Sequence, residues 1–238
     1  MANLYSVSTA PKFYRHSGFT DAILNSFTVA ANTPISLDFQ NENATTPGKM
    51  YVAYNTGDIV KEHSGFSKTI TQSRDLGAGN DLSGISYDGT TYFYSSNDVA
   101  NKVAKRTGFT NTIVSSFTLG LTIYYGTWNR ANSRFYQIER DTNRKFTQHN
   151  GFVKTISASF TMAATPDGLS WAGAYMYTGR RAVTDKFFKH SGFVKTITDS
   201  FVSTKNVEPF GHDFVPDVAA AIVRSPSGGA AYGSPMFY

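Results

Sequence analysis

Apolar and polar residues alternate over short stretches of this chain, and one such stretch recurs five times. In each copy an apolar residue stands three positions before a His or Arg, and a polar residue stands just before it. A period of two is typical of a strand with one buried face. A small polar residue and a glycine follow, which indicates a tight turn. The pattern therefore predicts a strand over 12–16, and four equivalents of it, each ending at such a turn.

The turn belongs to a repeated unit that covers almost the whole chain. Glycine at the turn lets the backbone adopt a positive φ, and the turn glycines lie 41 to 47 residues apart. A Phe follows every one of them. These repeat residues are Gly18, Gly65, Gly108, Gly151, Gly192, Phe19, Phe66, Phe109, Phe152 and Phe193. Such a period indicates a stacked or circular repeat architecture.

Further positions recur beyond the turn. An Ile stands four residues after each Phe, at Ile23, Ile70, Ile113, Ile156 and Ile197, and a closing Phe stands at Phe27, Phe117, Phe160 and Phe201. We expect the recurring Phe and Ile to fill equivalent core positions between neighbouring units. Two copies depart from the pattern. Arg74 replaces the closing Phe of the second unit, and Arg106 replaces the His of the third.

The other half of the unit predicts a second hairpin. Asp88-Gly89 between β-rich flanks is a strong hairpin signal, and Ala172-Gly173 takes the same place later in the chain. The segments 35–54 and 124–139 carry similar strands around longer, polar loops. A unit therefore holds four short strands.

Four antiparallel strands in about 43 residues are typical of a β-propeller blade. A β-helix needs a shorter period, and helical repeats need a period of 3.6. We predict an all-β, five-bladed propeller over residues 1–223. The strand over 3–9 and a final strand over 209–215 complete one blade together and so close the ring.

The chain ends in a Gly-, Ser- and Pro-rich stretch, residues 224–238, which is predicted to be a flexible arm. Residues 219–223 supply either an extra strand of the closing blade or the start of the arm. The arm could be a plain terminus or could dock on a partner. Its candidate docking residues are Arg224, Tyr232, Met236, Phe237 and Tyr238.

The repeats resemble a known class of propeller. The string G-I-x-x-D-G-T-x-Y at 84–92, followed by K-V-x-K at 102–105 and a Gly-Phe turn, is similar to NHL-type and YVTN-type repeats. The string K-H-S-G-F-V-K-T-I-T-x-S-F at 189–201 resembles a variant found in phage and environmental bacterial proteins. The resemblance implies a propeller that serves as a component of a phage virion.

Composition narrows the function. Cysteine is absent, which excludes disulfides, thiolate metal sites and a cysteine nucleophile. The net charge is +5, but the basic residues are scattered, which favours a weakly cationic surface over a nucleic-acid face. The N-terminus has no signal-peptide pattern, and the longest apolar run, 218–223, is too short to span a membrane. We therefore expect assembly in a bacterial cytoplasm without membrane insertion.

The titratable residues do not predict catalysis. His16, His63, His149 and His190 share one repeat position, where a structural role beside the turn is favoured over a metal site. His212 precedes Asp213, but no nucleophile recurs beside them. Carboxylates near the predicted first-hairpin turns are Asp38, Asp88, Asp167, Asp213 and Asp217. No catalytic or phosphate-binding fingerprint occurs, so we expect neither an enzyme nor a cofactor.

Aromatic residues in the first hairpins are the candidate binding residues, since such side chains stack on sugars and anchor protein interfaces. They are Trp128, Trp171, Tyr87, Tyr124, Tyr125 and Tyr175, together with His212. The alternative is that the aromatics pack between blades.

Three functions remain. The first is a virion structural protein, in the tail, on a fibre or on the capsid, that contacts other virion proteins or its own copies. The second is a lectin-like module that recognises a host-surface glycan or receptor. The third, nucleic-acid binding, rests on the isoelectric point of about 9.3 alone.

Overall fold

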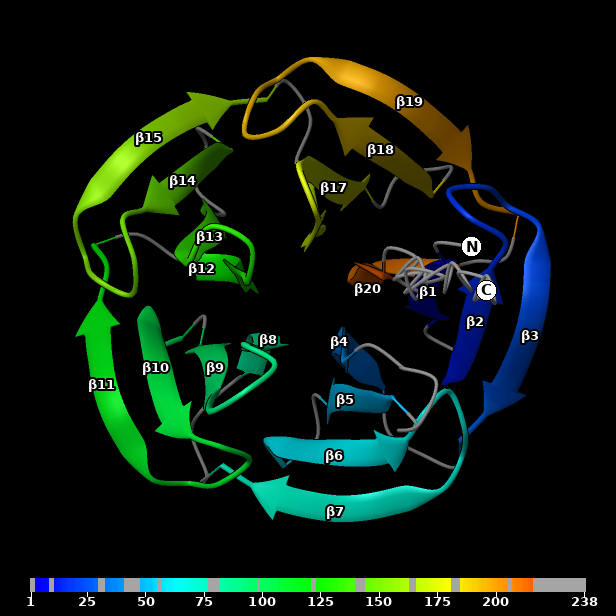
Figure 1. Cartoon of the computed structure of the whole chain (residues 1–238), viewed down its shortest axis with the longest axis horizontal. Helices are drawn as coiled ribbons and strands as arrows, with labels where there is room; N and C mark the ends of the chain where they lie inside the picture. Colours follow the sequence, from blue (N-terminus) through cyan, green and yellow to red (C-terminus); the bar gives the residue numbers. More distant parts are fainter. Residues whose placement is uncertain are drawn as a thin grey trace, which may run out of the picture.

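The computed structural model shows five four-stranded antiparallel sheets arranged around a central axis (Figure 1). It describes residues 3–8, 11–29, 33–40, 48–54, 57–76, 82–97, 99–120, 123–139, 144–162, 166–180, 185–204 and 207–215. The predicted all-β, five-bladed propeller is confirmed. Each blade runs from an innermost strand near the axis to an outermost strand at the circumference.

The strands follow the repeat. Blade 1 holds β20 (Val207–Val215), β1 (Asn3–Ser8), β2 (Lys12–His16) and β3 (Ile23–Thr28); blade 2 holds β4 (Pro34–Gln40), β5 (Lys49–Tyr54), β6 (Ile59–Ser64) and β7 (Ile70–Asp75). Blade 3 holds β8 (Leu82–Tyr87), β9 (Tyr92–Asn97), β10 (Lys102–Thr107) and β11 (Ile113–Thr118); blade 4 holds β12 (Ile123–Asn129), β13 (Arg134–Glu139), β14 (Lys145–His149) and β15 (Ile156–Thr161). Blade 5 holds β16 (Gly168–Ala172), β17 (Tyr175–Arg180), β18 (Lys186–His190) and β19 (Ile197–Val202).

The predicted ring closure is also confirmed. Strand β20 pairs antiparallel with β1, with Asn3 opposite Val215 and Ser8 opposite Val207, and a register shift falls between Ser6 and Val7. The two ends of the described chain therefore share blade 1. Residues 219–223 and the predicted arm lie outside the described residues.

The core consists of five aromatic clusters between blades. Each turn Phe packs against a Tyr on the second strand of the preceding blade, with ring centroids 5.2 to 5.5 Å apart. The pairs are Phe19–Tyr177, Phe66–Tyr5, Phe109–Tyr51, Phe152–Tyr94 and Phe193–Tyr136. The expected core role of the repeated Phe is confirmed. The glycine turn that precedes each Phe places its ring against the neighbouring blade.

The expectation for the repeated Ile is wrong. Ile70, Ile113, Ile156 and Ile197 are 41 to 45% exposed, and Ile23 alone packs partly against a cluster. The reason is a β-bulge where the third strand ends and the outermost strand begins, as between Arg15 and His16. The Ile is the first residue of an outermost strand that has a partner on one side only, so it faces solvent.

The turn glycines adopt the conformation that the sequence predicts. Gly18, Gly65, Gly108, Gly151 and Gly192 all have φ between 53° and 83°. A residue with a Cβ is strained in this region, so the turn selects glycine.

Candidate functional site

The innermost strands of blades 2, 3 and 4 are connected by side-chain hydrogen bonds. These strands have an unpaired backbone edge, and side chains of one blade accept hydrogen bonds from the next. Ser36 Oγ accepts from the Ile85 amide at 3.0 Å, Asp38 Oδ2 from the Tyr87 amide at 2.8 Å, and Ser86 Oγ from the Trp128 amide at 2.9 Å. Buried amides need such partners, so these polar residues hold neighbouring blades in register.

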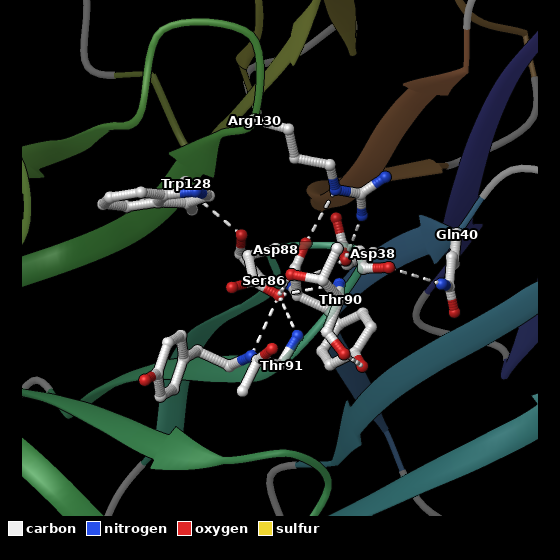
Figure 2. Close-up of polar contacts among 11 residues, drawn as sticks. Asp38, Gln40, Ser86, Asp88, Thr90, Thr91, Trp128 and Arg130 are labelled. Atoms are coloured by element: carbon white, nitrogen blue, oxygen red, sulfur yellow. Dashed lines mark hydrogen bonds and ion pairs between the residues drawn. The ribbon is translucent and has the colours of Figure 1, made fainter.

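An ion pair extends this network over three blades (Figure 2). Arg130, just beyond β12 of blade 4, donates from Nη2 to Asp38 Oδ2 of blade 2 at 3.0 Å and from Nε to the Tyr87 carbonyl of blade 3 at 2.7 Å. Gln40 Nε2 donates to the Gly89 carbonyl at 3.0 Å. We call Asp38, Arg130 and Gln40 the inner clamp.

The carboxylates of this region are engaged in structure. Burial raises the pKa of Asp38, and the positive charge of Arg130 opposes that shift. Asp38 lies near the end of β4, close to the predicted turn, and accepts a hydrogen bond from the next blade. Asp88 does cap its turn, because its Oδ1 accepts from the amides of Thr90, Thr91 and Tyr92 at 2.8 to 2.9 Å.

Most of the described candidate binding aromatics pack between blades. Trp128 stacks on Tyr94 with centroids 4.7 Å apart, Trp171 lies 4.5 Å from Tyr136, and Tyr87 lies 5.2 Å from Tyr51. The buried Tyr125 donates its hydroxyl to the Ile35 carbonyl of blade 2 at 2.6 Å.

Tyr175 differs from this group. It is 41% exposed, and Lys189 Nζ lies 4.0 Å from its ring centroid. Among the described candidate aromatics it therefore offers an open ring. The side chains of Tyr124 and His212, and the docking residues Arg224, Tyr232, Met236, Phe237 and Tyr238, lie outside the described residues.

The repeated histidines are buried at the ends of the third strands, as expected for a structural role. His16 shows the arrangement in full: its Nε2 lies 2.7 Å from Ser6 Oγ and its Nδ1 lies 2.9 Å from the Thr20 carbonyl. His190 Nε2 likewise lies 3.0 Å from Thr178 Oγ1. Burial lowers the pKa of His16 and His63 to about 4, and it also lowers the pKa of His149 and His190.

The described residues contain no group of three or more His, Cys, Asp or Glu that could hold a metal ion. Within the same part of the chain, no helix is long and apolar enough to cross a membrane.

The outermost strands form the second candidate region. We call β3, β7, β11, β15 and β19 the rim. Their side chains are mostly exposed, and β3, β11 and β15 contain no charged residue. Natural proteins usually protect an exposed edge strand with charge or proline as well as with a bulge. By contrast, β7 carries Arg74 and Asp75, and β19 carries Asp199, so β3, β11 and β15 are the rim strands whose edge lacks protection by charge.

The comparisons with known proteins bear on the fold. The propeller is similar to a chain in a crystal structure of a nidogen/laminin complex, with a TM-score of 0.61 and 11% identity over 90% of this chain and 98% of that one. It is similar to a protein of unknown function from Bacteroides caccae, with a TM-score of 0.61 and 8% identity over 91% of this chain and 99% of that one. Myxococcus xanthus glutaminyl cyclase gives a TM-score of 0.53 and 12% identity over 88% and 73% of the two chains.

No family model and no curated protein matches the sequence. Likeness at such low identity shows a β-propeller, a fold that typically serves as a binding platform, and leaves function to the particular surfaces of this chain.

The sequence did not predict the inner clamp. Asp38 and Arg130 stand in different repeat units, 92 residues apart, so no local pattern in the sequence connects them. The one trace in the sequence is that Leu-Asp-Phe at 37–39 resembles His-Asp-Phe at 212–214, which marks Asp38 as an inner-strand residue.

Proposed function

We propose that this chain is a non-enzymatic structural protein of a bacteriophage particle, in which the propeller is a binding platform that joins neighbouring copies of itself. The observation that carries the proposal is the rim. Five blades present the same kind of exposed, weakly charged edge strand, each beginning with an Ile.

The internal repeat supports a role for this surface. The innermost strands keep a pattern only in part: β8 and β16 share Gly, Ile or Leu, Ser and an aromatic residue, whereas PISLDFQ in β4 differs. The rim strands keep a common pattern, as ISASFT in β15 and IVSSFT in β11 illustrate, although packing asks little of an exposed Ile. Because the Ile recurs at exposed positions, its retention in every repeat is better explained by binding than by packing.

The number of rim strands favours assembly. Five equivalent edges on one subunit allow several weak strand pairings at once, and their combined strength exceeds that of each pairing alone. Backbone pairing between identical antiparallel edges needs no further complementarity, so a second copy of the chain fits the rim.

Sedimentation velocity of the full chain tests the self-association. We expect oligomers that a variant with Lys at Ile70, Ile113, Ile156 and Ile197 no longer forms. The matched control is Val99→Lys, which adds a charge at an apolar position that is 69% exposed and lies outside the rim. A wild-type chain that stays monomeric at all concentrations would overturn the assembly through the rim.

The phage role has a separate test in the genes that flank the coding sequence. We expect portal, terminase or tail genes beside it. Flanking genes of metabolism would overturn the virion role and leave the rim as an assembly surface of another kind of particle.

A further inference from the structure

The two residues that break the repeat face the same blade interface. Arg74 replaces the closing Phe on β7 of blade 2, and Arg106 replaces the His on β10 of blade 3. Arg74 Nε donates to the Phe109 carbonyl of blade 3 at 3.1 Å, so this side chain reaches across the interface.

An ordinary interface shows what these exceptions change. Between blades 1 and 2, the His63 ring lies 6.2 Å from Phe13 and 6.4 Å from Phe27, so a neutral imidazole faces two stacked rings. Between blades 2 and 3, the residues paired at the equivalent positions are Val60 and Arg74. A Val and an exposed Arg therefore stand where the interface between blades 1 and 2 has two stacked rings.

A small cavity lies beside this interface. Its lining residues all belong to blade 3, the polar ones being Ser95, Asn97, Lys102 and Arg106, and its volume is about 20 Å³. That is room for one water or one small ion. Two cationic side chains and a hydroxyl among its lining residues give it a positive character.

Arg106 needs a negative partner. It is only 4% exposed, its Nη1 donates to Ser95 Oγ, and its Nε has no hydrogen-bond partner among the described residues. Glu62, a buried acid on β6 of blade 2, is already engaged by Lys49 Nζ at 3.2 Å and Thr71 Oγ1 at 2.6 Å. A buried guanidinium is costly without a compensating charge.

We propose that the cavity binds a small monovalent inorganic anion of the size of chloride, held by the Arg106 guanidinium with Lys102 and Ser95. The cavity is too small for a phosphate with its oxygens, and the Arg supplies a fixed positive charge that His would not supply at neutral pH. The anion offsets the positive charge that Arg106 brings to this interface in place of a neutral His. The site does not depend on self-association, although Ile113 of the rim strand β11 also lines the cavity.

Thermal unfolding of the full chain in chloride tests the site, with sodium gluconate keeping the ionic strength constant. If the dissociation constant is about 1 mM, raising chloride to 100 mM raises the melting temperature by roughly 5 °C. Arg106→His restores the repeat residue and abolishes the response. Lys105→Gln is the matched control, because it removes a charge from the same strand where Lys105 lies over the Tyr92 ring at 3.6 Å. It keeps the response.

A second measurement tests the site without a variant, in case Arg106→His does not fold. Bromide soaked into crystals of the wild-type chain gives an anomalous peak beside Arg106. No peak, or an equal chloride response in Arg106→His, overturns the proposal. Asp81 and Asp98, which lie outside the described residues and adjoin Leu82 and Asn97 in sequence, supply the competing outcome. The proposal is also overturned if chloride has no effect and Asp81→Asn or Asp98→Asn destabilises the chain as much as Arg106→His. In that case a carboxylate of the chain itself is the counter-ion of Arg106.

Discussion

The inner clamp and the rim are opposite solutions to the same problem, an unpaired strand edge. At the axis, polar side chains such as Asp38 and Ser86 satisfy the backbone amides of the next blade. At the circumference, the rim strands leave that edge to solvent, with Ile residues that are almost half exposed. The difference teaches that polar side chains of a neighbouring blade secure the inner edge, whereas the outer edge is left exposed.

Acid should have the largest effect on the free energy of unfolding, because it protonates the buried histidines between the inner clamp and the rim. The buried histidines are neutral in the fold, with a pKa of about 4 for His16 and His63 against about 6.5 in the unfolded chain. The unfolded state therefore binds more protons between these values, so stability is present above pH 6.5 and falls as the pH drops towards 4.

Each of these two histidines contributes roughly 3 kcal/mol to that loss. Urea unfolding between pH 7 and pH 4 measures it, and a His16→Gln/His63→Gln variant should lose less stability over that range. A wild-type chain of constant stability would contradict the burial of neutral imidazoles.

Breaking the inner clamp comes next. Asp38→Ala removes the partner of Arg130 and the acceptor of the Tyr87 amide, and it should cost about 2–3 kcal/mol at pH 7, because the Arg130 side chain is still 32% exposed. Asp38→Asn keeps the shape and should cost less. Chemical denaturation measures both, and a double-mutant cycle with Arg130→Ala isolates the coupling between the pair. A coupling near zero would show that the clamp does not secure the ring.

The turn that separates the third strand from the rim has an intermediate effect. Gly151 has φ 83° and nothing within 4 Å of an added Cβ, so Gly151→Ala tests backbone strain alone and should cost about 1 kcal/mol. Gly120→Ala is the control, because it meets equally open space without a positive φ and should be neutral or slightly stabilising. Equal effects in the two variants would contradict a strained turn.

The rim should show the smallest effect on stability. Ile156→Thr keeps a β-branched residue at a position that is 41% exposed, so the free energy of unfolding should change by less than about 0.5 kcal/mol. The same variant should weaken self-association measured by sedimentation. A large loss of stability without a change in assembly would reverse the roles assigned to the rim and the core.

Deleting residues 224–238 separates the arm from the rim. If the arm is a plain terminus, the truncated chain should keep its melting temperature and its assembly. Loss of assembly with an unchanged melting temperature would instead make the arm the docking element, which the sequence leaves open.

The amino-acid sequence by itself determined the number of blades, the four strands of each, the glycine turns and the closure of the ring, because these follow from local periodicity and an internal repeat. It also pointed to the turn Phe as core residues. Only the tertiary structure decided which face each residue meets. The repeated Ile lies outside because a bulge precedes it on an edge strand, and Asp38 meets Arg130 because the inner strands converge near the axis. Arg74 and Arg106 meet one interface because they stand on facing blades.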